Sequence, residues 1–264
     1  MFADPDVEAV VRVAVAMPSG PISAGDVAGL KQLELVWPDV PACPSSDYAN
    51  CIDYMSAPHA DHWVTSLAGV ECLTNLESLA VDAFALNLDP LRALPHLNNL
   101  FLGPVVGSKP PPLPQVKTLE CSAVPVSGFI SAFAGLATLT IHGVDVPSGA
   151  APIEVWALPD LTELSIANSG LADLAPLAGL TNLLTLDLSG NEIHDLRPLA
   201  PLTKLVTIDL AQNEVTDLSP LLKMAGLGVG SELDLTGNPL DCAAQASNLD
   251  ALRARLVKVD ADCP

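Results

Sequence analysis

The chain has 264 residues with 31 acidic and 11 basic side chains, a net charge of −20, and half of its residues are hydrophobic although only 4% are aromatic. This charge disfavours nucleic acid and anionic lipid surfaces as partners, and it permits a basic partner without requiring one. No apolar run approaches the about 18 residues expected of a membrane span, so we expect no transmembrane segment.

Two short helices are predicted at the N-terminus. Asp4 can cap the first helix, and the valines that follow it form one apolar face. Acidic residues precede this apolar run and Arg12 lies within it, which argues against a signal peptide. Ser23 and Asp26 have the spacing of a capping box, which predicts the start of the second helix.

The first strand is predicted to start at Leu30, and an insertion at 36–63 interrupts the pattern that follows it. This segment has no repeat pattern and holds Cys43, Cys51, His59 and His62, two of the three Trp and both Tyr. The four side chains are possible zinc ligands, but the spacing C-x7-C-x7-H-x2-H matches no common zinc finger. A Cys43–Cys51 disulfide or free thiols are the preferred hypotheses, and a zinc site remains the alternative.

A repeating pattern is clearest in 183–221, which reads LLTLDLSGNEIHDLRPLAPLTKLVTIDLAQNEVTDLSPL. Its apolar positions recur after 22 residues, as do Asn191 and Asn213. This is the L-x-x-L-x-L-x-x-N-x-L pattern of a leucine-rich repeat, in which one coil cannot bury its apolar side alone. We expect the Asn side chains to bond backbone groups of adjacent coils. Strand starts are predicted at Leu30, Leu76, Leu97, Val116, Leu136, Leu161, Leu183, Leu205 and Gly230.

The outer segments of the coils are predicted to be short turns. Asp173, Asp195 and Asp217 each precede Leu-x-Pro-Leu and can cap a short helical turn that the proline helps to preset. The run 110–114 is rich in proline and is predicted to be a polyproline II spacer, with an SH3-type ligand as the alternative.

The chain closes with a last strand and turn, followed by a helix that Asp241 can cap and a terminal strand at 257–260. Cys242 and Cys263 bracket this segment, where a disulfide would staple the end of the array. Cys72 and Cys121 are predicted to be buried thiols.

The chain resembles bacterial leucine-rich-repeat proteins of the internalin-like group. The resemblance rests on DPDVEAVVRVAVAMPSGPISAGDVAGLKQLEL at the N-terminus, on ADLAPL, HDLRPL and TDLSPL in the repeats, and on the closing segment. It implies one α/β leucine-rich-repeat solenoid with a parallel concave β-sheet, short 3-10 or polyproline turns on the convex side, and helical caps. The expected parts are an N-cap at 1–29, about nine repeats at 30–240, and a C-cap at 241–264.

No catalytic motif appears, and we expect neither enzymatic activity nor a cofactor. The resemblance implies a monomeric protein-protein interaction module with a protein or peptide ligand, extracellular or in the cell envelope, the cytoplasm being the alternative. Its concave face and the 36–63 loop are the expected binding surfaces. The alternative functions are a metal-binding or enzymatic module built on the Cys/His insertion and a purely structural acidic envelope protein.

Side chains alternate along a strand, so the residues between the inward leucines face the ligand. In the two clearest repeats these are Leu184, Thr185, Asp187, Ser189, Val206, Thr207, Asp209 and Ala211. Asp187, Asp209 and Asp234 would form an acidic ladder that costs stability unless a cation or a basic partner relieves it. The predicted binding residues are Glu34, Glu77, Asn99, Phe101, Glu120, Thr140, His142, Glu163, Ser165, Asp187, Asp209, Glu232 and Asp234.

Overall fold

The computed structural model describes residues 2–35, 64–81, 86–103, 109–122, 128–142 and 158–263. The chain divides into two compact units, Met1–Leu136 and Ala137–Pro264. The insertion at 36–63 lies outside the described residues, and with it the hypotheses of a Cys43–Cys51 disulfide and of a zinc site. Among the described helices, none is long and apolar enough to cross a membrane.

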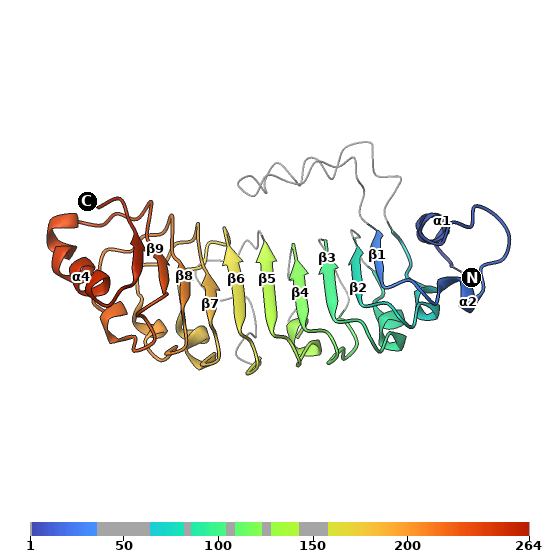
Figure 1. The fold of residues 1–264 in the computed structure, drawn as a ribbon, viewed down its shortest axis with the longest axis horizontal. Helices are drawn as coiled ribbons and strands as arrows, with labels where there is room; N and C mark the ends of the chain where they lie inside the picture. Colours follow the sequence, from blue (N-terminus) through green and yellow to red (C-terminus); the bar gives the residue numbers. More distant parts are fainter. Residues whose placement is uncertain are drawn as a thin grey trace. The chain divides into compact units, whose positions relative to one another are not determined.

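The first unit begins with two α-helices and continues as coils, each with a short strand and most with a 3-10 turn (Figure 1). Strands β1 to β4 are parallel and paired in chain order. The elements are α1 (Pro5–Ala14), α2 (Ala24–Val27), β1 (Gln32–Leu35), η2 (Val70–Cys72), β2 (Ser78–Val81), η3 (Asp89–Ala93), β3 (Asn99–Leu102), β4 (Thr118–Cys121) and η4 (Ile130–Ala132).

The second unit contains the most regular coils. Its strands β5 to β9 are also parallel and lie in chain order (Figure 1). Strand β10 pairs in parallel with β9, and α4 packs beside β10. The elements are β5 (Thr138–His142), β6 (Glu163–Ala167), η7 (Ala175–Gly179), β7 (Thr185–Asp187), η8 (Arg197–Leu199), β8 (Thr207–Asp209), η9 (Leu221–Lys223), β9 (Glu232–Asp234), α4 (Cys242–Ala254) and β10 (Lys258–Asp260).

Asp4 joins α1 to the chain that follows the insertion. Its Oδ1 accepts hydrogen bonds from the backbone of Asp6 at 2.9 Å and of Val7 at 3.4 Å, which confirms the predicted cap. Its Oδ2 accepts from the backbone N of Thr65 at 2.7 Å and from the Thr65 hydroxyl at 2.8 Å. Burial raises the pKa of Asp4, but these hydrogen bonds outweigh it and leave the pKa lowered.

The second predicted N-terminal cap is also present. The backbone N of Ser23 donates to Asp26 Oδ2 at 2.7 Å, as a capping box requires. Helix α1 packs against β1, the first strand of the sheet. Because the apolar side of the first coil would otherwise face water, this contact explains why the repeats begin with helices.

The core of each unit is made by the inward residues of consecutive strands. In the second unit Leu164, Leu186, Ile208 and Leu233 stand in register, and each is at most 1% exposed. Burying one such side chain contributes about 2 kcal/mol, and the stack repeats this gain in every coil. A large aliphatic side chain, leucine or isoleucine, is therefore required at these positions of the coils.

Asparagine side chains bond the turns of adjacent coils, as the sequence predicted. Asn213 is 5% exposed, and its Nδ2 donates to the carbonyls of Leu188 at 2.9 Å, Leu210 at 3.1 Å and Ala211 at 3.2 Å. Its Oδ1 accepts from the backbone N of Ile193 at 3.0 Å. One amide therefore satisfies backbone groups of two coils that have no partner in the sheet.

Asn191 and Asn238 make equivalent bonds. One coil has Ser169 at the asparagine position, and its backbone N–H groups bond to the asparagine of the next coil. Asn191 Oδ1 accepts from the backbone N of Ser169 at 3.0 Å and of Leu171 at 2.9 Å. Asn238 donates to the Leu210 carbonyl at 2.8 Å and accepts from the backbone N of Val215 at 2.9 Å. The asparagines are therefore scaffold residues.

The outer turns follow the sequence pattern. Asp173, Asp195 and Asp217 each accept a hydrogen bond from the backbone N two residues ahead, at 2.8, 2.9 and 2.8 Å. Within 110–114 no helix or strand forms, in keeping with the predicted spacer. Pro110 and Pro111 are buried, so these two prolines are not presented as an SH3-type ligand would be.

The turn after each regular strand requires a positive φ, and large residues alternate with glycine there. The φ values are 52° at Asn168, 68° at Gly190, 56° at Gln212 and 73° at Gly237. A Cβ added at Gly190 would overlap the Asn168 side chain, and one at Gly237 would lie 3.1 Å from Gln212 Cγ. Each glycine thus makes room for the side chain of the preceding coil.

The C-terminal cap is also as predicted. Cys242 and Cys263 form a disulfide, and Asp241 caps α4 by accepting from the backbone N of Ala243 and Ala244, each at 3.0 Å. Burial, with a smaller contribution from Glu120, raises the pKa of the Cys121 thiol to about 12, so this thiol is unreactive. The prediction for Cys72 is wrong in degree, because its side chain is only half-buried.

Asn213→Ala is expected to lower the free energy of unfolding by about 3 kcal/mol, since it leaves buried backbone groups of two coils without a partner. Urea unfolding followed by circular dichroism measures this loss. Asn182→Ala is the matched control, because Asn182 also donates across coils, to the Pro159 carbonyl, but near the surface. Equal losses in the two variants would contradict the structural role of Asn213.

Gly190→Ala is expected to destabilise the chain by about 1–2 kcal/mol, through the positive φ and the overlap with Asn168. Replacing Asn168 by glycine in the same chain removes the overlap and leaves only the backbone cost. A double-mutant cycle of unfolding free energies measures the coupling. Strict additivity of the two substitutions would show that the Asn168 side chain does not cause the alternation.

Candidate ligand-binding face

The strand register aligns the outward residues into columns. In the first unit the middle column holds Glu34, Ala80, Phe101 and Glu120, and Asn99 lies in the column before it. These outward side chains, apart from the more exposed Glu34, are half-buried, whereas the leucines between them are buried. The columns therefore form the accessible side of the strands.

In the second unit the columns extend to the last strand. The first column is Thr138, Glu163, Thr185, Thr207, Glu232 and Lys258, and the middle column is Thr140, Ser165, Asp187, Asp209, Asp234 and Asp260. His142 stands beside Ala167 at the ends of β5 and β6. The predicted binding residues of this unit therefore share one face. The prediction left out Lys258 and Asp260, although it included a terminal strand at their position.

Glu77 is displaced by one position from the first column, where Ser78 stands instead. Its Oε1 lies 2.6 Å from Lys31 Nζ in an exposed ion pair between neighbouring coils. In the second unit the equivalent position holds Leu184 and Val206, with exposed fractions of 44% and 40%. Glu77 therefore belongs with the edge of the face and not with its first column.

The aspartates of the middle column have a structural role as well as a charge. Asp187 Oδ1 accepts from the backbone N of Ser189 at 3.0 Å, and its Oδ2 accepts from the Ser165 hydroxyl at 2.9 Å. Asp209 Oδ1 accepts from the backbone N of Ala211 at 2.9 Å, and Asp234 Oδ1 from that of Thr236 at 2.9 Å. One oxygen of each carboxylate thus closes the turn after its strand. Sequence reasoning missed this role.

The carboxylates of Asp187, Asp209 and Asp234 stand on adjacent strands, and the pKa of the middle one, Asp209, is raised. Burial is the main cause that raises the pKa of Asp209, and the charges of Asp187 and Asp234 raise it further, while the hydrogen bond from Ala211 opposes them. Within the described part of the chain, no group of three or more His, Cys, Asp or Glu side chains is placed to hold a metal ion.

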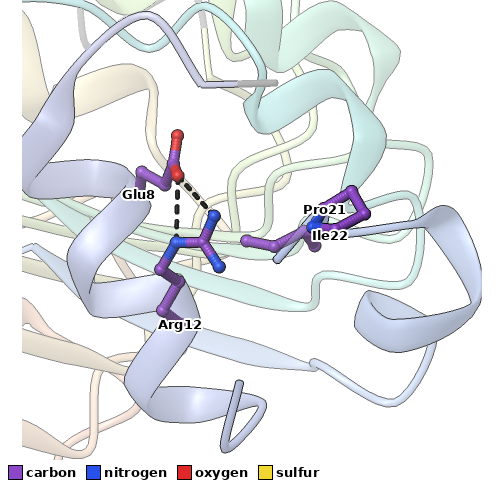
Figure 2. Close-up of a pocket in the computed structure, with 4 residues that line it drawn as sticks. All are labelled: Glu8, Arg12, Pro21 and Ile22. Carbon is purple, nitrogen blue, oxygen red and sulfur yellow. Dashed lines mark hydrogen bonds and ion pairs between the residues drawn. The ribbon is translucent and has the colours of Figure 1, made fainter. Parts of the chain in front are cut away.

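A small hollow lies beside α1 and is lined by Glu8, Arg12, Pro21 and Ile22 (Figure 2). The Arg12 guanidinium donates to Glu8 Oε1 from Nε at 2.9 Å and from Nη2 at 2.7 Å. It also donates to the carbonyls of Met17 at 3.2 Å and Gly20 at 2.9 Å. Arg12 therefore holds the connection between the two N-terminal helices.

A family model described as Leucine Rich repeats (2 copies) matches residues 159–201 and 181–223. No curated protein sequence has a significant match to the chain. Residues 159–223 are the region in which the asparagine bonds and the leucine stack are most regular. The match therefore agrees with the geometry of the second unit.

Three solved structures have a similar fold. Internalin C2 of Listeria monocytogenes is 23% identical with a TM-score of 0.55, over 98% of this chain and 94% of that one. The internalin inlF of the same species is 19% identical with a TM-score of 0.60, over 99% and 77%. A leucine-rich-repeat protein of Leptospira interrogans is 22% identical with a TM-score of 0.55, over 72% and 50%. The fold is thus that of an internalin-like bacterial leucine-rich-repeat protein, an α/β solenoid.

Asp209→Asn is expected to raise the free energy of unfolding at neutral pH. A carboxyl group with a raised pKa in the folded chain costs stability above that pKa, and it costs none below its usual value of 3.8, where both states are protonated. The gain of the variant should therefore shrink as the pH falls from about 7 to about 3. Urea unfolding of both proteins across this range measures the difference, and a gain that does not depend on pH would contradict the electrostatic cause.

Proposed function

We propose that the chain is a non-catalytic protein-binding module that receives a protein or peptide ligand on the outward columns of its strands. The fold supports this function, since leucine-rich-repeat domains are typical protein-protein interaction modules. One observation carries the proposal: inward strand positions of the second unit are all Leu, Ile or Val, whereas the outward ones include Thr, Glu, Ser, Asp, His and Lys. The inward positions are therefore aliphatic in every coil, whereas the type of outward side chain changes from coil to coil.

The proposal includes a basic ligand, a monomeric chain, and a location outside the cell or in its envelope. The net charge of −20 and the acidic middle column favour a ligand of opposite charge. The similar Listeria proteins are internalins, which motivates the location. The 36–63 loop, which the sequence suggested as a further binding surface, lies outside the described residues.

Photo-crosslinking from two threonines of one coil tests the proposal. Thr207 lies in the first column of the face, and Thr216 is exposed on the turn beyond the strand. A benzophenone amino acid replaces either residue in the chain produced by its native cells. We expect a discrete protein adduct from position 207 and none from position 216.

The two positions separate this function from the structural alternative. An acidic envelope protein without a specific ligand would give no discrete adduct from either position, or equal and diffuse adducts from both. Either result would overturn the proposed function.

A further inference from the structure

Strand β10, the last of the described sheet, has little of the apolar core that holds the other strands. In the two strands before it the inward residues Ile208 and Leu233 are each 1% exposed. The inward residue of β10 is Val259, which stands in register with Leu233 but is only half-buried. The other two residues of this strand, Lys258 and Asp260, are exposed. Apolar burial therefore contributes less to holding β10 than to holding any regular strand.

The turn after β10 is joined to the preceding coil by a side chain where other coils use the backbone. One coil earlier, the backbone N of Gln212 donates to the Thr236 carbonyl at 2.7 Å. At the equivalent place the backbone N of Gly237 donates to Oδ2 of Asp262 at 2.7 Å, and this contact is exposed. Water competes for an exposed hydrogen bond, so its net contribution is small.

The remaining attachment of β10 is its short ladder to β9. The backbone N of Lys258 donates to the Ser231 carbonyl at 2.8 Å, and the backbone N of Leu235 donates to the Asp260 carbonyl at 2.8 Å. A ladder of three residues with one side unburied is only marginally stable in water. The segment 258–263 therefore needs a further constraint to stay in place.

The disulfide supplies this constraint at the far end of the segment. It joins Cys263, which follows β10, to Cys242 at the start of α4, 21 positions earlier. Within 258–263 only Cys263 is buried, with an exposed fraction of 8%. A covalent link of this kind removes most of the freedom that the released segment would gain.

Helix α4 is held by contacts that do not involve the disulfide. Its inward residues Leu249 and Leu252 are 2% and 0% exposed. Arg255, which follows the helix, donates from Nη1 to the Leu222 carbonyl at 3.1 Å and from Nη2 to the Met224 carbonyl at 2.7 Å. These contacts tie the C-terminal end of α4 to the coil that contains η9, so the helix does not depend on the disulfide for its position.

We propose that the Cys242–Cys263 disulfide is a redox switch of the C-terminal cap. While the disulfide is formed, residues 258–263 add β10 to the sheet. Reduction releases this segment from β9, whereas α4 stays in place. The inference goes beyond the proposed function and does not depend on it.

Release of the segment changes the outward columns of the second unit. Lys258 is the one basic side chain in the two columns, and its Nζ lies 3.6 Å from Glu232 and 3.5 Å from Asp260. Without Lys258 the columns carry acidic charge alone, and β9 becomes an edge strand that is open to pairing with another strand. An oxidising compartment keeps the switch closed, and a thiol-rich cytoplasm opens it.

The reduction is an ordinary thiol–disulfide exchange with a dithiol as the reductant. Cys242 is half-buried and is the more exposed of the two cysteines, so the attacking thiolate reaches its Sγ first. The S–S bond breaks, and Cys263 leaves as a thiolate that takes up a proton. The second thiol of the reductant then displaces Cys242 as a thiol. The reductant becomes a cyclic disulfide, and the protein gains two electrons and two protons.

Hydrogen–deuterium exchange of the full chain, followed by mass spectrometry, tests the inference. The exchange is measured before and after treatment with the dithiol. We expect the amides of 258–263, Leu235 and Gly237 to exchange at least about tenfold faster after reduction. The amides of α4, β7 and β8 should keep their rates.

Matched variants assign the effect to this disulfide. The double variant Cys242→Ser and Cys263→Ser should show the fast exchange without reductant, and the dithiol should change it no further. Cys72→Ser is the control, because it removes another half-buried cysteine. This control should keep both the slow exchange and the response to the dithiol. Because the unaltered chain is reduced in its folded state, the test does not depend on how well the double variant folds.

Three outcomes would overturn the inference. Unchanged exchange of 258–263 after complete reduction, with the mass of the chain confirming both thiols, would show that the strand is held by its own contacts. Faster exchange throughout β7, β8 and α4 would show that the disulfide supports the whole unit and does not release one segment. A response of the double serine variant to the dithiol would assign the effect to other cysteines.

Discussion

The structure depends on one constraint, which is that a single coil cannot bury its apolar side or satisfy its turn without the next coil. The inward leucines of adjacent strands pack against one another, and Asn213 donates hydrogen bonds to carbonyls of two coils. The same constraint explains both ends. Helix α1 covers β1, and α4 packs beside β10 with the Cys242–Cys263 disulfide. Stacking therefore determines the period, the caps and the core together.

The outward side chains of the strands are the part of the coils that a ligand could contact. Asp187, Asp209 and Asp234 show that one side chain can serve both purposes, because one oxygen closes the turn while the carboxylate charge remains on the face. The exposed apolar side chains of Leu184 and Val206 stand one position before the first column of the face.

The locally encoded features were predictable. Asp4, the Ser23–Asp26 pair, the Leu-x-Leu alternation and the repeated Asn are patterns whose partners lie a few residues away or one period further on. The outward direction of Asp187, Asp209 and Asp234 was predictable because side chains alternate along a strand. Glu77 lies one position before the first column, a detail that only the backbone pairing decides, because a shift of one residue moves a side chain to a different column. Lys258 and Asp260 were left out, although the terminal strand was expected.

The sequence by itself determined the leucine-rich-repeat class, the caps and the residues that point outward, because these follow from periodicity and short-range hydrogen bonding. Only the tertiary structure decided which outward residues become neighbours. Lys258 and Asp260 join the first and middle columns because β10 pairs in parallel with β9, and the buried Ser231 stands where the two preceding coils expose Leu184 and Val206. The positive φ of Leu256 was equally hidden, since it arises where the end of α4 must turn into β10. The arrangement of side chains on the face depends on the contacts between coils, so it cannot be read from the sequence of one repeat.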